Sequence, residues 1–377
     1  MRLGLRHNAV LWSVRRGALL VLAFVLLAMA HPAMADIALK DVTGREVRLA
    51  QPANRLLIDD GRFLIALALI HPDPVSVLAA WPRDVNRIGK RTFEAYKAKF
   101  PAIDNLAKVA SSAGSLSVEQ VVAARPDLAV FSLGSQPSDE ERARIEAAGI
   151  PVVVIDFFTH PLANLEPSLR LLGAATGRSA QAEDFLAFRR ARIDAVRAKV
   201  EGITDGERPR VFLEPHAAMT ADCCNSPGRG NVGDIIEAVG GTNIGAAVIP
   251  RAFGKLNLEY VIAQDPQVYI ATGGSHMEGT GGLLIGPEYS QERARETLAR
   301  VVARPGFSGL AAVRDKRVHG LSHQMLNSPL DLFTVEILAK WIHPERFAGL
   351  DVGRTVEEVN ARFLAVPVEG PNWIDLD

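Results

Sequence analysis

Two copies of one pattern, GSLSVEQVVAARPDLAVFSLG (114–134) and GKLNLEYVIAQDPQVYIATGG (254–274), lie 140 residues apart in this chain. They align without a gap. Each reads as a helix, a proline and an apolar strand in turn. Seven positions are identical, namely Gly114/Gly254, Leu116/Leu256, Glu119/Glu259, Val121/Val261, Ala123/Ala263, Pro126/Pro266 and Gly134/Gly274. Internal duplication of this kind predicts two lobes of similar architecture.

Strand and helix patterns alternate through both halves of the chain. In the first half, strand patterns cover 55–58, 128–132 and 152–156, and helix patterns cover 63–70, 118–124 and 138–148. In the second half, strand patterns cover 210–214, 268–271 and 317–322, and helix patterns cover 232–239, 258–263, 291–302 and 330–341. This alternation is typical of parallel sheets covered by helices. We therefore expect an α/β fold of two Rossmann-like lobes with parallel sheets.

One long helix is predicted between the lobes. It runs from Ser179 to about Glu201, and Phe185, Phe188 and Ile193 fall on one face at the helical period. A helix of that length spans about 33 Å, enough to reach along both lobes. The expected boundaries are 36–177 for the N-terminal lobe, 178–203 for the connecting helix and 204–377 for the C-terminal lobe.

The first 35 residues have the pattern of a secretory signal peptide. Four arginines and no acidic residue precede the apolar segment Ala18–Ala30. The thirteen residues of this segment fall short of the roughly 20 that a transmembrane helix needs. Ala-Met-Ala, which ends at Ala35, fits a cleavage site. We expect export to the periplasm with cleavage after Ala35.

Charge and motifs exclude several classes of protein. Cleavage after Ala35 would leave 38 basic and 43 acidic residues, and no Lys/Arg run offers a patch for nucleic acid. The sequence contains neither a G-x-S-x-G elbow nor an H-E-x-x-H helix. GRGNVG (228–233) matches the G-x-G-x-x-G motif of dinucleotide-binding loops. That motif should directly follow a strand, but here thirteen residues separate it from the preceding predicted strand. We expect a chain that is not an enzyme; an exported hydrolase is the remote alternative.

At the duplicated segments the chain resembles the helical-backbone class (class III) of periplasmic substrate-binding proteins. The export signal, the two lobes and the long helix extend the resemblance over 37–365. Such proteins serve ABC importers of ferric siderophores, haem and cobalamin. The resemblance implies that the lobes clamp a ligand, and that Glu119 and Glu259 dock on arginines of an ABC-transporter permease. We expect a monomer that needs no cofactor of its own.

The candidate ligand-binding residues follow from the expected sheets. Ligands of open parallel sheets bind at the carboxyl ends of the strands. Four histidines follow predicted strands, His160, His216, His276 and His323. Imidazole ligates metals or hydrogen-bonds the oxygens of a chelate. Arginine forks bind anionic oxygens and tryptophan stacks on flat groups, which adds Arg62, Trp81, Arg83, Arg229 and Arg251 to the set.

These residues leave several ligands open. A ferric siderophore is the leading prediction, because loop arginines favour an anionic metal chelate over a bare cation. A haem or cobalamin receptor is an alternative within the same class. A free zinc or manganese receptor is another, in which the four histidines would need carboxylate help from Glu214. Asn231 is also expected to cap a helix whose free N–H groups, with Arg229, suit an anion.

Cys223 and Cys224 are the only cysteines of the chain. They lack the C-x-x-C spacing of a thioredoxin-like site, and no second pair completes a zinc site. Adjacent Cα atoms lie about 3.8 Å apart, below the usual separation across a disulfide. A vicinal disulfide that stiffens the loop before Arg229 is still favoured over free thiols in an oxidising compartment, and thiolate ligation of a metal ranks third.

Overall fold

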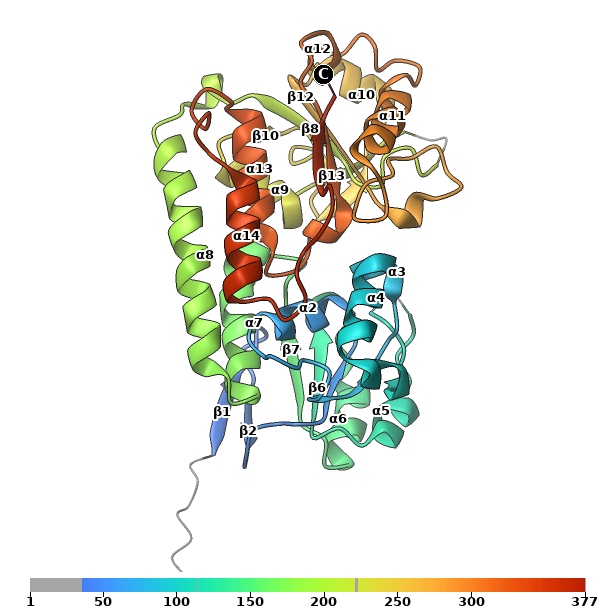
Figure 1. Cartoon of the computed structure of the whole chain (residues 1–377), viewed down its shortest axis with the longest axis vertical. Coiled ribbons are helices and arrows are strands. Elements are labelled where there is room, and N and C mark those ends of the chain that lie inside the picture. The colour runs from blue at the N-terminus through green and yellow to red at the C-terminus, as the bar shows by residue number, and fades with distance from the viewer. Residues whose placement is uncertain (1–35, 113, 221–222, 377) are drawn as a thin grey trace, which may run out of the picture.

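The structure is a computed structural model that describes residues 36–112, 114–220 and 223–376. The predicted signal peptide therefore lies outside the described residues. Two α/β lobes, each with its own sheet, are joined along one side by a long helix (Figure 1). The predicted fold class is confirmed.

The N-terminal lobe contains a five-stranded parallel sheet of order β5-β4-β3-β6-β7. Its strands are β3 (Leu56–Ile58), β4 (Leu78–Trp81), β5 (Ala107–Lys108), β6 (Leu128–Ser132) and β7 (Val152–Ile155). Its helices are α2 (Arg62–Ala68), α3 (Val85–Ile88), α4 (Lys90–Lys99), the 3-10 helix η1 (Pro101–Asn105), α5 (Val118–Ala124), the 3-10 helix η2 (Leu133–Ser135), α6 (Asp139–Ala147) and α7 (Pro161–Ala175). An antiparallel ribbon of β1 (Ile37–Lys40) and β2 (Glu46–Leu49) precedes the sheet. The central strands are buried on both faces, as their continuous apolar runs require.

The C-terminal lobe has a five-stranded sheet of order β10-β8-β12-β13-β14, in which only β14 is antiparallel. Its strands are β8 (Arg210–Glu214), β10 (Thr242–Asn243), β12 (Val268–Gly273), β13 (Val318–Ser322) and β14 (Trp373–Asp375). Its helices are η3 (Asp205–Glu207), α9 (Asn231–Ala238), α10 (Leu258–Gln264), η4 (Ser275–Met277), α11 (Gln291–Val302), α12 (Ala311–Arg314), η5 (His323–Met325), α13 (Asp331–Ile342) and α14 (Val352–Arg362). A small ribbon pairs β9 (Asn225–Pro227) with β11 (Phe253–Lys255).

The duplicated segments fold alike down to their capping groups. Ser117 caps the N-terminus of α5 by accepting from a backbone N–H, and Asn257 caps α10 in the same way. At the other ends, Arg55 donates to the last carbonyl groups of α5 and Arg210 to those of α10. These carbonyls have no partner inside a helix. Each lobe thus uses an arginine near the start of one strand to complete the helix that leads into the next.

The connecting helix α8 (Ser179–Val200) packs on α7 of the N-terminal lobe and on α13 of the C-terminal lobe. Figure 1 shows it running along the flank of both lobes. Arg189 fastens it to α13 through two hydrogen bonds of 2.8 and 2.7 Å to the Asp331 carboxylate, and both side chains are buried. One apolar core continues from Leu56 through Phe185 to Trp341. The two lobes are therefore packed as one body on the α8 side.

The last residues connect the lobes a second time. After α14, the backbone N–H of Ala365 donates to the carbonyl of Ala68, and Lys99 donates to the Ala365 carbonyl. The chain then returns to the C-terminal lobe, where β14 pairs with β13. The tail at 366–377, to which the sequence assigns no clear role, thus crosses between the lobes over its described residues.

A third contact between the lobes involves Asn231, and it corrects the predicted cap. The N-cap of α9 is Gly230, and the Asn231 backbone N–H donates to the carbonyl of Thr159 at 2.9 Å. The Asn231 amide donates to the Phe158 carbonyl and to Asn327 Oδ1. Protein groups of both lobes therefore occupy the start of α9, and the anion site expected there is wrong.

Candidate functional site

Three of the predicted histidines meet at the carboxyl ends of β8, β12 and β13. His216 Nδ1 lies 2.7 Å from His276 Nε2, and the ring centroids of His216 and His323 are 3.9 Å apart. Thr272 connects the cluster to the sheet, because its hydroxyl accepts from the His216 backbone N–H and lies 3.0 Å from His323 Nδ1. Adjacent parallel strands end at one edge of the sheet, so the residues that follow them converge.

The surroundings keep these imidazoles uncharged. Burial, followed by the charge of His276, lowers the pKa of His216 from 6.5 to about 4. Burial also lowers the pKa of His276. For His323 the pKa is held well below its ordinary value by burial, by the other two histidines, and by Arg62 and Arg87 of the facing lobe. At neutral pH the cluster therefore offers nitrogen lone pairs, the form that ligates metals.

The facing wall, in the N-terminal lobe, is organised by the buried carboxylate of Asp60. Arg62 donates to it from Nε at 2.9 Å and from a terminal nitrogen at 2.6 Å. Arg87 and the Ser112 hydroxyl also donate to it. Burial alone would raise the pKa of Asp60, but the two arginines lower it below its ordinary value. Asp60 thereby holds two guanidinium groups, and Arg87 Nε also lies 3.1 Å from an Asp84 carboxylate oxygen. The N–H groups that these carboxylates leave unused are available to a ligand.

A second buried carboxylate supports the same wall. Asp59 accepts from the backbone N–H and hydroxyl of Ser132 and from the Ser135 hydroxyl. Burial raises the pKa of Asp59 to about 7, although these hydrogen bonds act against that shift. The acceptor capacity of this wall is thus largely used within the protein, and the surface left for a ligand is rich in donors.

Two cavities that share the lining residue Phe158 lie between the walls. One has a volume of about 590 Å³ and is lined by Arg62, Arg87 and Phe158 among others. The other, of about 1090 Å³, is lined by Phe158, His216, Arg251, Phe253, Lys255 and His323. Phe158 belongs to both, and its ring lies 5.5 Å from that of Phe253 in the opposite lobe. We call this space the cleft. Arginine and lysine side chains, aromatic rings and neutral imidazoles make up much of its lining.

The other predicted site residues divide into two groups. Arg62 and Arg251 line the cleft. The exposed Arg229 donates to the Ala246 carbonyl, and Arg83 donates to the carbonyls of Asp104 and Leu106; neither lines the two cavities. The His160 side chain is 55 % exposed, with Nδ1 3.9 Å from an Asp234 carboxylate oxygen, and it also lies outside them.

The prediction for Trp81 is wrong. Its side chain has no exposed surface and stacks on Phe93 with ring centroids 5.7 Å apart. Successive side chains of a strand point to opposite faces of the sheet, and Trp81, the last residue of β4, points into the apolar core. It is therefore unable to stack on a ligand in the cleft.

Sequence reasoning missed several residues of the cleft. Phe158 follows β7 just as the histidines follow their strands, so the same rule could have found it. Arg87 follows β4, a strand that the sequence analysis does not predict. Phe253 and Lys255 belong to the ribbon strand β11, which is three residues long and too short to show a period.

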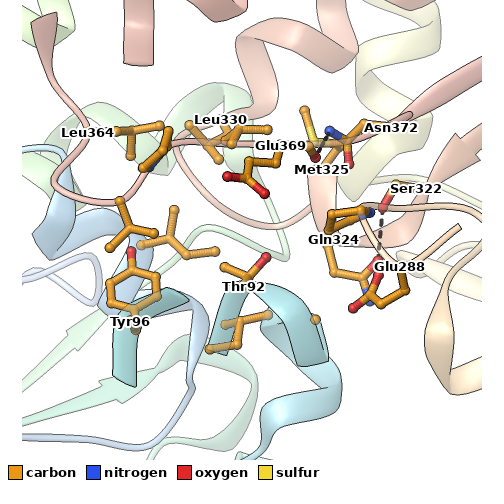
Figure 2. Close-up of a pocket in the computed structure, with 17 residues that line it drawn as sticks. Thr92, Tyr96, Glu288, Ser322, Gln324, Met325, Leu330, Leu364, Glu369 and Asn372 are labelled. Carbon is orange, nitrogen blue, oxygen red and sulfur yellow. Dashed lines mark hydrogen bonds between the residues drawn. The ribbon is translucent and has the colours of Figure 1, made fainter. Parts of the chain in front are cut away.

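A further cavity, separate from the cleft, lies between the lobes and is lined by none of the predicted site residues. Figure 2 shows Thr92 and Tyr96 of one lobe facing Glu369 and Glu288 across it. Arg91 joins the lobes beside it, with its backbone N–H donating to Glu288 at 2.9 Å and its Nε 3.4 Å from a Glu369 oxygen. The last residues of the chain thus close this side of the molecule.

Glu119 and Glu259 lie far from the cleft, each in the first turn of its helix. Both are exposed, and Glu119 forms an ion pair of 2.7 Å with Arg144. α5 and α10 lie at opposite ends of the flank away from α8 (Figure 1). The two carboxylates are therefore presented to solvent, one on each lobe.

The cysteines pack on the side of β8 that carries Phe212, next to Tyr269, and neither of them lines the cleft. The structure joins Cys223 and Cys224 as a disulfide between adjacent residues. The backbone of Cys224 exchanges two hydrogen bonds of 2.9 Å with that of Leu256, just before α10. The Glu214 carboxylate points to this side, where Arg304 and Tyr269 bind it. Its expected help to the histidines is therefore wrong.

Comparison with known proteins decides the family. A family model described as "Periplasmic binding protein" matches residues 67–324, more than half of the chain. The chain belongs to the periplasmic binding protein family. Membership implies a small-molecule ligand, an ABC-transporter permease as partner and a place in the periplasm. The family consists of solute-binding proteins, which confirms the prediction that the chain is not an enzyme.

Solved structures of periplasmic binding proteins share the fold. The TroA-like FepB from Veillonella parvula is 24% identical with a TM-score of 0.81, and the match covers 90% of this chain and 99% of FepB. MolA from Haemophilus influenzae, bound to molybdate, is 18% identical with a TM-score of 0.67 over 89% and 99% of the two chains. CeuE from Helicobacter pylori, with Ni(II) bound, is 18% identical with a TM-score of 0.65 over 86% and 95%. At these identities the likeness shows the fold alone.

No curated protein sequence matches this chain. Within the described residues, every helix is too short or too polar to cross a membrane.

Proposed function

We propose that this periplasmic binding protein captures an anionic iron chelate, a ferric siderophore, and delivers it to an ABC permease. One observation carries the proposal: the uncharged imidazoles of His216 and His323 line a cleft with several cationic side chains and face a donor-rich wall. The third imidazole, of His276, contacts His216. Anionic oxygens of a chelator suit the guanidinium groups of Arg62, Arg87 and Arg251. Imidazoles suit either an open coordination position of the metal or the remaining chelate oxygens.

A bare zinc or manganese ion fits the cleft less well. Metal sites of that kind need three or four donor atoms close together. Among the described residues, two of the histidines approach closely, but the three do not bring one ring nitrogen each within 4.8 Å of both others; the group that does so is Glu214, Cys223 and Cys224. Arg251 and Lys255 would also repel a free cation. Solved structures with this fold include proteins that bind molybdate, haem or Ni(II), so the fold leaves the choice of ligand to the residues of the cleft.

The remaining parts of the proposal concern export and docking. We place cleavage after Ala35 and expect the mature protein to work as a monomer. Glu119 and Glu259 are proposed to pair with arginines of the permease, since both are exposed on matching helices of the two lobes. Lobe closure around the chelate would bring the two carboxylates to the spacing that the permease recognises.

Native mass spectrometry of the protein from the periplasm of iron-starved cells tests the ligand class. We expect a complex heavier by an organic ferric chelate, and the same chelate in a His160→Ala variant. A complex heavier by the mass of haem or cobalamin would show that the alternative ligand, and not a siderophore, is bound. A complex with a bare metal ion that is lost in His276→Ala would favour the free-metal receptor. Either result would contradict the proposal.

A further inference from the structure

A group of potential metal ligands lies outside the cleft and is not used by the proposed function. Cys223 Sγ, Cys224 Sγ and a Glu214 carboxylate oxygen all lie within 4.8 Å of one another. They come from the end of β8 and from the loop that leads into β9. Cys223 lines an open groove together with Arg300 and Arg304, whereas Cys224 and Glu214 are buried beneath it.

We propose that reduction of the Cys223–Cys224 disulfide opens a site for one thiophilic divalent ion, held by the two thiolates and Glu214. While the disulfide is closed, neither sulfur is available as a thiolate ligand. The proposal does not depend on what the cleft binds, because Glu214, Cys223 and Cys224 are not among the residues that line the cleft.

The Glu214 carboxylate has room for such an ion. Among the described residues, its Oε2 accepts from the Tyr269 hydroxyl at 2.6 Å and from Arg304, while Oε1 accepts one hydrogen bond of 2.9 Å from Arg304. A carboxylate oxygen offers about two lone-pair sites. Oε1 therefore keeps one lone pair for a metal ion while it still accepts the hydrogen bond from Arg304.

The charges of the site balance in both redox states. With the disulfide closed, the carboxylate of Glu214 is paired with the guanidinium of Arg304. With the thiols reduced and a divalent ion bound, two thiolates and one carboxylate face one dication and one guanidinium. Buried charges are tolerated when they are paired in this way. The nearby arginine also favours the thiolate form that ligates metals.

The chemistry needs a dithiol as reductant. A thiolate of the dithiol attacks the half-buried Cys223, and Cys224 leaves as a thiolate that is then protonated. The second thiol of the reductant closes its own disulfide and releases Cys223, so two electrons and two protons pass to the cysteine pair. The divalent ion then displaces both thiol protons. Soft thiolate ligands favour zinc and its heavier congeners.

Cadmium(II) is the probe, because binding by thiolates gives a sulfur-to-metal charge-transfer absorption that imidazole and carboxylate do not give. The full mature chain is reduced with dithiothreitol, the dithiothreitol is removed under anaerobic conditions, and the chain is then titrated with cadmium(II). We expect iodoacetamide to label no cysteine before reduction and two afterwards, and one cadmium per reduced chain to protect both. The untreated chain should show no such absorption.

Two variants test the assignment. Cys224→Ser should lose the absorption, and Glu214→Gln should weaken cadmium binding at least about tenfold, with circular dichroism confirming that both remain folded. A folded, reduced chain without the absorption would overturn the proposal. So would an undiminished signal in Cys224→Ser, or full labelling of both cysteines before reduction.

Discussion

The histidines of the cleft show how position along a strand decides chemistry. His216, His276 and His323 each follow a buried parallel strand, and burial keeps their rings uncharged. His160 also follows a strand, but its side chain reaches solvent on the start of α7. The rule that ligands bind at strand ends thus predicts which residues lie at the edge of the sheet. It does not predict the direction in which their side chains point.

Replacing His276 should weaken chelate binding selectively. His276→Ala removes the ring that lies 2.7 Å from Nδ1 of His216, which lines the cleft. The loss of this partner should cost about 1–3 kcal/mol, which is roughly 5-fold to 100-fold in Kd. His160→Ala is the matched control and should bind like the native protein. Quenching of tryptophan fluorescence by a ferric chelate measures both. Equal losses in the two variants would remove His276 from the site.

The pKa of His216 predicts how stability depends on pH. Its pKa is about 4 in the folded protein against 6.5 for an ordinary histidine. Between these values the unfolded chain binds a proton that the folded chain does not, so stability falls as the pH is lowered from 6.5 to 4. The His216→Gln variant should lose less of its free energy of unfolding over this pH range than the native protein, by at most about 3 kcal/mol. Urea unfolding at pH 7 and pH 4.5 measures it, and an unchanged pH dependence would contradict the shift.

At the scale of elements, α8 holds the two lobes together through a buried ion pair. Arg189 and Asp331 are both almost inaccessible to solvent and bind each other bidentately. Breaking a buried pair leaves one charge uncompensated, whereas replacing both partners by apolar residues is often neutral. Arg190, on the exposed face of the same helix, pairs with Glu166 of α7 and provides the comparison.

Arg189→Met should therefore lower the free energy of unfolding by about 3–5 kcal/mol. The double variant Arg189→Met/Asp331→Leu should recover most of this loss. Arg190→Met, on the exposed face, should change stability by less than about 1 kcal/mol. Denaturant unfolding of the four proteins provides the measurement. If Arg189→Met is no more harmful than Arg190→Met, the buried pair does not fasten the helix.

The sequence predicts the elements whose ends are marked by capping residues. The duplicated helices, capped by Ser117 and Asn257, begin where the pattern places them, and the capping box at Ser138 marks α6. α7 escapes prediction because Pro161 and Pro167 lie in its sequence, and proline usually interrupts a helix. β4 escapes because four apolar residues look alike in a strand and in a buried helix. The residues that follow β4, Arg87 among them, are lost from the predicted site with it.

At the scale of the whole molecule, four sets of contacts limit movement of the lobes. The apolar core passes continuously along α8, and the tail crosses between the lobes. Asn231 binds the Thr159 carbonyl, and Arg91 binds Glu288 and Glu369, two residues that line the cavity in Figure 2. A packed core has discrete arrangements and resists gradual deformation. Ligand capture should therefore involve a small hinge movement.

Small-angle scattering tests this rigidity. We expect the radius of gyration of the mature protein to change by less than about 1 Å when the ferric chelate binds, in line with pre-organised complexes. Arg91→Ala, which removes the ion pair of an exposed side chain, should keep the fold and widen the change. A large decrease in the native protein on binding would contradict the account of a continuous core.

The central claim is that the donor-rich wall and the neutral histidines together bind an anionic ferric chelate. Calorimetric titration of the mature protein with such a chelate, compared with Arg87→Gln and with Arg229→Gln, tests it most directly. Arg87 faces His323 across the cleft, whereas Arg229 lies outside it. We predict a loss of about 10-fold to 100-fold in affinity for Arg87→Gln and none for Arg229→Gln. Unchanged binding by Arg87→Gln, or tighter binding of a bare divalent cation than of the chelate, would contradict the claim.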